Sequence, residues 1–451
     1  MTAATPSADR TAVTASVRKQ SRLHVIVFFA TLAYLAYAWV DFDVNGLIAK
    51  SRPERAVLLA TDAVAHKVHV TADLRRGGLV TAIEGERTAT YDEPPPWVTM
   101  HDEDRATTDL GDGYSVDIDG ANQRMRFTVP GYGTVEVAVI KRRIVTTLPH
   151  NAPPPPWMRV TDRKFDARPT LARRVQVSVA KIEVHRYFLG WENFFFPFNS
   201  DLQDLSAGQL IGLMLDDRRL HEDASNAAYV FETFWDNPDW QHGAVFVALL
   251  ETVMMALLGT LTAAFVGLPL ALLAASNFTP AMTLRFFVRR LFDLLRGIDM
   301  LIWSLIFIRA FGLGPLTGAL AIAFTDTGTL GKLFSEALEN IDRRQVEGVA
   351  ATGAGRLQRY RFGVIPQILP IFLSQVLYYL ESNTRSATVI GALGAGGIGL
   401  MLVETMRTAR DWENTFYIII LTIGVVIAMD ALSSALRRRL IHGRDDHARS
   451  R

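Results

Sequence analysis

The sequence predicts an α-helical membrane protein with about six transmembrane helices and an inserted extracytoplasmic β-rich domain between spans 1 and 2. Uncharged apolar segments such as 25–40 and 364–380 are about as long as one crossing of a bilayer. Residues 41–243 contain no such segment and instead show short apolar and polar alternation, which is typical of β-strands. Basic residues gather in every second connection, as expected for loops on the cytoplasmic side.

The composition agrees with a membrane protein that keeps a large water-exposed part. The 451 residues are 49% hydrophobic and 21% charged, more apolar than a soluble enzyme. The chain has 0 cysteines, which excludes a disulfide framework, a thiol nucleophile and a thiolate metal site. The formal net charge of +1 points to no class of partner, and no nucleic-acid partner is predicted.

The N-terminal region is predicted to place the following domain outside the cytoplasm. Residues 1–22 form a cytoplasmic tail that becomes basic near its end, and residues 23–40 form a transmembrane anchor helix. Ala36-Tyr37-Ala38 is also compatible with a signal-peptidase site. The length of the apolar run favours a retained anchor, and either interpretation sends the next residues out of the cytoplasm.

Residues 41–243 are predicted to form the extracytoplasmic β-rich domain and a connector to the next span. Alternation of apolar and polar residues is clearest in 114–118, 134–139 and 175–179. Two proline runs favour short polyproline connections between strands, 94–96 and 153–156.

Three aspartates of this domain, Asp112, Asp117 and Asp119, invite comparison with a calcium loop. Their spacing does not match the calcium-binding EF-hand pattern, and Asp119-Gly120 is typical of a tight turn. The sequence therefore predicts no metal site.

Residues 244–436 are predicted to form a five-span core, followed by a basic cytoplasmic tail, 437–451. The expected spans are 244–275, 291–310, 312–330, 364–380 and 415–436. Charges interrupt the second of these spans, and Asp326 interrupts the third. With six spans in all, the basic groups near residues 18–22, 285–290, 332–361 and 437–439 share one side, which places both termini and the 331–363 loop in the cytoplasm.

That loop contains Glu347-Gly-Val-Ala-Ala-Thr-Gly353-Ala354, with Pro366 twelve residues further on. Near the start of a short helix, Glu347 suits the positive end of the helix dipole, and Gly353 allows a sharp turn. Pro366 can begin the next helix because it needs no N–H donor there. An ordinary basic loop remains the alternative on this pattern alone.

The segment resembles the EAA motif of ABC importer permeases, with Gly348 and Val349 where that motif has two alanines. Further motifs follow the order found in permease subunits of phosphonate ABC importers, a family with relatives for phosphite and phosphate: 250–260, 312–318, 331–336, 351–354, 360–367, 381–391 and 394–399. The resemblance covers about 238–440. Asp299 stands where a proline is expected, and the β-rich domain is an insertion relative to compact members.

The resemblance implies a permease of the ABC importer type, located in the cell inner membrane. It further implies ABC ATPase subunits that bind ATP and Mg, an extracytoplasmic substrate-binding protein, and a second permease copy or close paralogue. No cofactor is expected in this chain, since Gly331-Lys332 lacks the rest of a phosphate-binding loop. The residues implied for ATPase coupling are Glu347, Gly348, Ala351, Gly353, Ala354 and Pro366.

A polar group follows the apolar run 364–380 and predicts a substrate pathway through Glu381, Asn383, Arg385 and Ser386. Glu381 and Arg385 are four apart, so on a helix they share a face and can neutralise each other. Asn383 points elsewhere and needs a partner on another helix. A buried ion pair that pins two helices is the competing interpretation, whereas for a phosphonate dianion Arg385 would be a suitable transient ligand.

The last motif is rich in glycine: Gly391, Gly394, Gly396, Gly397 and Gly399. It satisfies a dinucleotide-binding pattern, but no βαβ unit surrounds it, so cofactor binding is rejected. The glycines are predicted to reverse the chain or pack helices closely near an outer gate.

The predicted function is that of a permease subunit, not an enzyme, in an ATP-driven importer for phosphonate or a related phosphorus oxyanion. A methionine-like amino-acid importer and a membrane-anchored ligand sensor are the alternatives.

Overall fold

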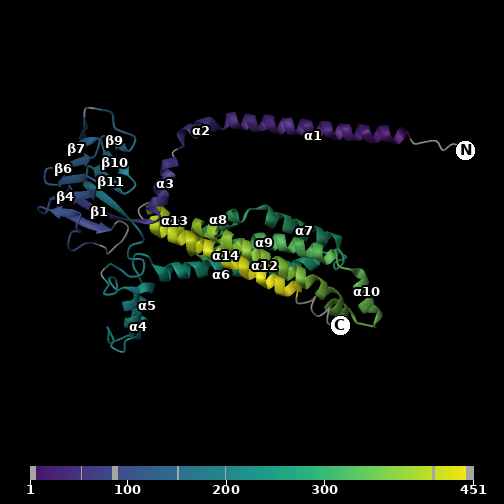
Figure 1. Ribbon diagram of the computed structural model, residues 1–451. Helices are drawn as coiled ribbons and strands as arrows, with labels where there is room; N and C mark the ends of the chain where they lie inside the picture. Colours follow the sequence, from purple (N-terminus) through teal and green to yellow (C-terminus); the bar gives the residue numbers. More distant parts are fainter. Residues whose placement is uncertain are drawn as a thin grey trace. The chain divides into compact units, whose positions relative to one another are not determined.

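The computed structural model describes residues 7–51, 53–83, 90–149, 152–198, 200–408 and 412–442. The chain divides into two compact units, Met1–Ala60 and Thr61–Arg451 (Figure 1). Most of the predicted C-terminal tail, residues 443–451, and the first six residues of the predicted N-terminal tail lie outside the described residues.

The first unit is helical. Helix α1 (Ser7–Asp41) contains an apolar stretch, His24–Asp41, that is long enough to cross a membrane. The helix begins well before residue 23, so the described part of the predicted tail is continuous with the predicted anchor. Helix α2 (Val44–Lys50) follows, with the Asp43 carboxylate accepting a hydrogen bond from the Gly46 amide at 3.1 Å. Helix α3 (Pro53–Asp62) follows, and its last two residues belong to the second unit.

The second unit begins with two six-stranded antiparallel sheets (Figure 1). One is a meander in the order β3-β4-β5-β6-β7-β8, with bounds Val98–Met100, Arg105–Gly111, Tyr114–Asp119, Arg124–Val129, Gly133–Ile140 and Arg143–Thr147. The other has the order β2-β1-β12-β11-β10-β9. In chain order, β1, β2, β9, β10, β11 and β12 span Ala65–Asp73, Leu79–Ile83, Met158–Val160, Lys164–Thr170, Arg173–Ser178 and Lys181–Leu189.

Alternating side chains from both sheets form a single core, in which Phe127 and Phe165 are fully buried. The first and last strands pair with each other, in register from Ala65 opposite Leu189 to Asp73 opposite Lys181. The chain therefore enters and leaves the domain at the same place. This arrangement suits a domain inserted between two segments of another fold.

The three aspartates considered for metal binding have separate contacts. Asp112 pairs with Arg173, Asp117 accepts a hydrogen bond from Thr107, and Asp119 accepts one from the Asn122 amide in the turn after β5. Across the described residues, no group of His, Cys, Asp or Glu has the arrangement of a metal site.

An aromatic cluster joins the domain to the helices that follow, which include the short helices α4 (Ala207–Leu215) and α5 (Asn226–Trp235). Phe194 packs against Trp240, His242 and Tyr417 at ring distances of 4.8–5.4 Å. Since the Phe194 carbonyl can only accept, His242 donates to it from Nε2 at 2.7 Å, which leaves Nδ1 to accept from the Tyr417 hydroxyl at 2.8 Å.

The remaining residues form a helical bundle (Figure 1). Its helices are α6 (His242–Ala274), α7 (Met282–Gly297), α8 (Met300–Phe311), α9 (Pro315–Glu339), α10 (Arg343–Ala351), α11 (Arg356–Arg359), α12 (Ile365–Ile390), α13 (Gly397–Thr408) and α14 (Trp412–His442). In the described residues, four helical stretches are long and apolar enough to cross a membrane: His24–Asp41, His242–Ala274, Arg356–Ala395 and Trp412–Arg439.

One predicted span is wrong. Residues 291–310 are two helices, because α7 ends at Gly297 and α8 begins at Met300. Asp299 is extended and caps α8, its carboxylate accepting from the Leu301 amide at 2.8 Å. At position 299, where a proline was expected, an aspartate therefore caps the start of a helix.

Two other predicted spans are too short. The predicted span 312–330 lengthens to α9 (Pro315–Glu339), and 364–380 lengthens to α12 (Ile365–Ile390). The added ends of these helices contain buried polar residues such as Ser335 and Asn383, which an apolar run cannot indicate. The number of spans, about six, stays a prediction.

Candidate functional site

The predicted coupling segment forms helix α10 and the turn after it. Glu347, Gly348 and Ala351 lie in α10, none of whose side chains is buried. Gly353 has a φ of +80° and its amide donates to the Ala350 carbonyl at 3.1 Å, so it makes the sharp turn expected of it. Ala354 follows in that turn.

The placement of Glu347 near the start of the helix is wrong. Glu347 lies in the middle of α10, and the helix start is occupied by Asp342, whose carboxylate accepts from the Arg344 amide at 2.9 Å. The favourable interaction with the helix dipole therefore belongs to Asp342.

The coupling segment is attached to the beginning of α12. One π-helical turn (Tyr360–Val364) precedes α12, and Pro366 lies in the first turn of that helix. A Cβ on Gly363 would lie 3.2 Å from the Cα of Val346, so α10 approaches this turn closely. Gln367 completes the attachment: its Nε2 donates to the Gly363 carbonyl at 2.6 Å, and its Oε1 accepts from the Asp342 amide at 2.9 Å.

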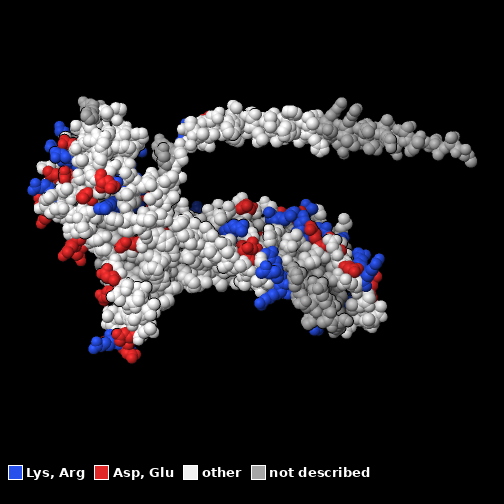
Figure 2. Space-filling view, viewed as in Figure 1, with Lys and Arg blue, Asp and Glu red and all other residues white. Residues whose placement is uncertain are grey.

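The surface beside α10 is apolar and basic. Leu357 and Phe362 are 81% and 62% exposed, and the neighbouring arginines are Arg356, Arg359 and Arg361. Figure 2 shows Lys and Arg side chains gathered over α7 and near α10 at the same end of the bundle. Exposed apolar side chains among polar residues are typical of a protein-binding surface.

The expected pair between Glu381 and Arg385 does not form. Glu381 instead accepts a hydrogen bond from Arg437 of α14, at 3.2 Å. Arg385 is exposed, and in the described part of the chain its side chain has neither an ion pair nor a hydrogen bond. Ser386 donates to the Ser382 carbonyl of its own helix at 3.3 Å.

Asn383 lies in a buried polar cluster that joins three helices. Its side-chain amide donates to Thr260 of α6 at 2.8 Å and to Asp326 of α9 at 2.5 Å. Asn383 is 1% exposed and Asp326 is 2% exposed, so both side chains are removed from any open pathway in this conformation. The sequence-based prediction did not identify Thr260 and Asp326 as the partners of Asn383. An acidic residue inside a predicted span was the available signal.

The glycine-rich motif makes a tight reversal between α12 and α13. Gly394, Gly396 and Gly397 have φ angles of +115°, +90° and +67°, which favour glycine. A Cβ on Gly391 would lie 2.4 Å from the Gly396 carbonyl oxygen, and one on Gly399 would lie 1.9 Å from that of Thr388.

The same motif docks on α6. Glu251 accepts a hydrogen bond from the Gly397 amide and Thr252 accepts one from the Ile398 amide, both at 3.0 Å. These two side chains cap the start of α13. The glycines thus have the packing expected of them, and a role at an outer gate stays a prediction.

Comparison with known proteins identifies the helical part. The family described as "Binding-protein-dependent transport system inner membrane component" matches residues 267–442. A "Putative phosphite transport system permease protein" of Stutzerimonas stutzeri is 37% identical over 187 residues, 42% of this chain and 66% of that protein. A "Phosphate-import permease protein" of Mycolicibacterium smegmatis is 35% identical over 192 residues, 43% of this chain and 36% of that protein.

A third relative is matched almost completely. A "Putative cryptic phosphonate transport system permease protein" of Escherichia coli is 46% identical over 122 residues, 27% of this chain and 99% of that protein. A "Probable D-methionine transport system permease protein" of Haemophilus influenzae is less similar, at 23% identity over 44% of this chain and 99% of that protein. The chain spans less than two thirds of the first two relatives, but the match to the third shows that it belongs to the family of binding-protein-dependent transport system inner membrane components.

Proposed function

We propose that this chain is the transmembrane permease subunit of an ATP-driven importer for phosphonate or a related phosphorus oxyanion. The observation that best supports this function is the exposed helix α10, which Gln367 holds against the start of the membrane helix α12. A separate ATPase that binds ATP and Mg docks on α10 and on the surface formed beside it by Leu357, Phe362, Arg356, Arg359 and Arg361. Its movement shifts the bundle between inward and outward access.

The assembly contains a second permease copy, which is either this chain or a close paralogue, and an extracytoplasmic substrate-binding protein. Both termini and the coupling segment lie in the cytoplasm, and the β-rich domain lies outside, where it extends the surface offered to the binding protein. The alternation of basic loops supports this orientation. The pairing of β1 with β12 supports insertion of the domain between two spans.

Arg385 is the proposed transient ligand of the substrate. Its guanidinium is exposed on α12 one turn after Glu381, whose carboxylate is engaged with Arg437. An arginine within a span is costly in lipid and is typical of a residue that lines a pathway. The planar guanidinium donates two parallel hydrogen bonds to phosphoryl oxygens, so it suits this substrate class. Of the other predicted pathway residues, Ser386 contributes a hydroxyl next to Arg385. Asn383 contributes to the packing of α12 against its neighbours.

The relatives favour a phosphorus oxyanion over methionine. The three more similar proteins have phosphite, phosphate or phosphonate in their names, and the methionine-type relative is 23% identical. A ligand sensor is the third candidate, and it requires no ATPase.

Transport by the reconstituted complex tests the proposal. The chain is placed in ATP-loaded proteoliposomes with its ATPase and binding protein, and uptake of labelled methylphosphonate, phosphite, phosphate and methionine is measured. We expect ATP-dependent uptake of at least one phosphorus oxyanion and none of methionine. Methionine uptake alone, or failure of any ATPase to purify with the chain, would overturn the proposal.

A further inference from the structure

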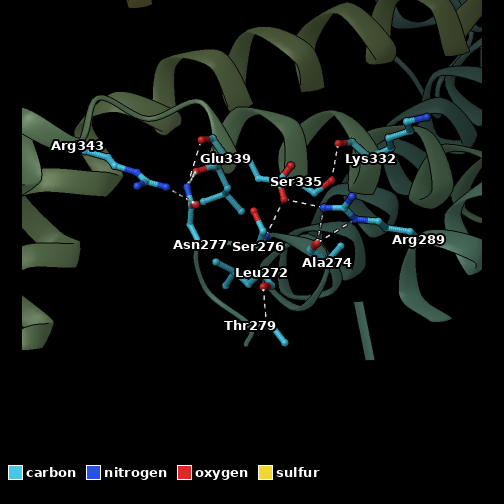
Figure 3. A network of polar contacts seen from close by, with 11 residues as sticks. Leu272, Ala274, Ser276, Asn277, Thr279, Arg289, Lys332, Ser335, Glu339 and Arg343 are labelled. Atoms are coloured by element: carbon cyan, nitrogen blue, oxygen red, sulfur yellow. Dashed lines mark hydrogen bonds and ion pairs between the residues drawn. The ribbon is translucent and has the colours of Figure 1, made fainter. Parts of the chain in front are cut away.

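A polar network connects the ends of α6 and α9 with Arg289 in the middle of α7, beside helix α10 (Figure 3). Glu339, the last residue of α9, accepts hydrogen bonds from the Ser276 amide at 2.7 Å and from Arg289 of α7 at 2.6 Å. Arg289 also donates to the carbonyl of Ala274, the last residue of α6, at 3.1 and 3.2 Å. We call Ser276, Asn277, Arg289 and Glu339 the clasp.

Asn277 connects the clasp to α10. Its side-chain Nδ2 donates to the carbonyls of Leu338 and Glu339 at 3.2 and 3.1 Å, which satisfies acceptors that the end of α9 leaves free. Its Oδ1 accepts from the guanidinium of Arg343, the first residue of α10, at 3.3 Å. One amide side chain thus contacts both the end of α9 and the start of α10 (Figure 3).

The attachments of α10 to the bundle are few. In the described part of the chain, side-chain hydrogen bonds reach the start of α10 from Gln367 of α12 and from Asn277 of the clasp. Val346 adds an apolar contact with the helical core. Because α10 has no buried side chain, a displacement imposed on it reaches other helices through these attachments, through the close approach of Val346 to Gly363, and through the chain that links Glu339 directly to Arg343.

We propose that Arg343 and Asn277 are positioning residues that carry movement of α10 to the ends of α6 and α9, in parallel with the Gln367 connection to α12. This inference rests on the proposed function, since it assumes that an ATPase moves α10. Two connections at one helix start allow a single displacement to shift α12 together with α6 and α9. Losing the Asn277 connection leaves ATP hydrolysis in place but weakens its transmission to those two helices.

The test measures substrate taken up per ATP hydrolysed in proteoliposomes of the complete complex. Arg343→Ala and Asn277→Ala are compared with Arg343→Lys, which keeps a cation, and with Arg290→Ala, a matched control. Arg290 is an exposed neighbour of Arg289 that pairs with Asp293 outside the clasp. Co-purification of the ATPase is checked for each variant.

We expect Arg343→Ala to lower the ratio about fivefold with hydrolysis retained, Arg343→Lys to restore part of it, and Arg290→Ala to leave it unchanged. The double variant Arg343→Ala/Asn277→Ala should be no worse than Asn277→Ala alone, because both changes remove one connection. If Asn277→Ala does not assemble, Arg343→Ala decides by itself.

An unchanged ratio in Arg343→Ala, or uptake and hydrolysis that fall together, would overturn the inference. A wild-type complex without uptake of any phosphorus oxyanion would instead overturn the proposed function, so the two failures are distinguishable.

Discussion

Asn383 donates a hydrogen bond to the carboxylate of Asp326 at 2.5 Å, and the two side chains are almost wholly buried between α12 and α9. Asn383→Ala leaves the carboxylate without this donor, so we expect it to destabilise the protein by about 1–3 kcal/mol. Thermal unfolding in detergent measures the effect. Ser386→Ala, which removes a hydrogen bond within one helix, is the control and should change the midpoint little. Equal midpoints for the two variants would contradict the prediction.

Gln367→Ala should loosen the start of α10, the proposed coupling helix. The Asp342 amide then loses its acceptor on α12, so we expect faster amide hydrogen exchange over α10 with little change along α12 itself. Gln375→Ala, on the same helix, is the control, since the Gln375 side chain has no hydrogen bond among the described residues. Unchanged exchange in α10 would show that the amide contact does not hold it.

The two glycines of the proposed coupling segment, Gly348 and Gly353, should respond in opposite ways to alanine. Gly353→Ala places a Cβ on a residue with a φ of +80°, which costs about 1 kcal/mol and disturbs the turn. Gly348→Ala meets nothing within 4 Å and removes a helix-weakening residue, which stabilises α10 by up to about 1 kcal/mol. We expect uptake to fall in the first variant and to persist in the second. Loss of uptake in Gly348→Ala would instead indicate a direct contact with the ATPase at that position.

Gly328→Ala should separate α7 from α9. A Cβ there would lie 2.7 Å from the Phe292 carbonyl oxygen and 2.8 Å from the Arg296 nitrogen, both backbone atoms that cannot rotate away. Overpacking of this kind costs about 1–3 kcal/mol, which a lower thermal midpoint would reveal. Gly297→Ala, where a Cβ meets nothing within 4 Å, is the matched control. A wild-type midpoint in Gly328→Ala would contradict this packing.

Acid should weaken the contribution of Asp166 to the β-rich domain. Burial alone would raise the pKa of Asp166, but hydrogen bonds and charge from Arg174, with help from Gln176 and Lys164, outweigh it and lower the pKa below its usual 3.8. A lowered pKa in the folded state stabilises the protein above the unfolded-state pKa, and this contribution is lost as the pH falls through the folded-state value.

The pH dependence of unfolding tests this sign. Asp166→Asn should lower stability at pH 7, and the difference from the wild-type protein should shrink below about pH 4. Unfolding of the intact protein is followed by far-UV circular dichroism, at wavelengths where β-sheet contributes to the signal. A difference that grows as the pH falls would contradict the assignment.

The relation between sequence and structure differs from one element to the next. Alternation predicted strands in 114–118, 134–139 and 175–179, which lie in β5, β7 and β11 apart from Val179. Alternation works there because one face of each strand packs into the shared core. The run 291–310 is not one helix, because Asp299, one of the charged residues that interrupt it, caps the start of a second helix, α8.

The sequence by itself determined the long apolar helices, the β-rich character of the region before them, and the helix and turn of the coupling segment, because these depend on hydrophobic period and local backbone chemistry. Only the tertiary structure decided which polar groups meet. Arg437 takes the place beside Glu381 that Arg385 was expected to fill, and Asn277 lies 66 residues from Arg343 in the chain. Such partners come from different helices, so no local pattern specifies them, and packing of the whole bundle brings them within hydrogen-bonding distance.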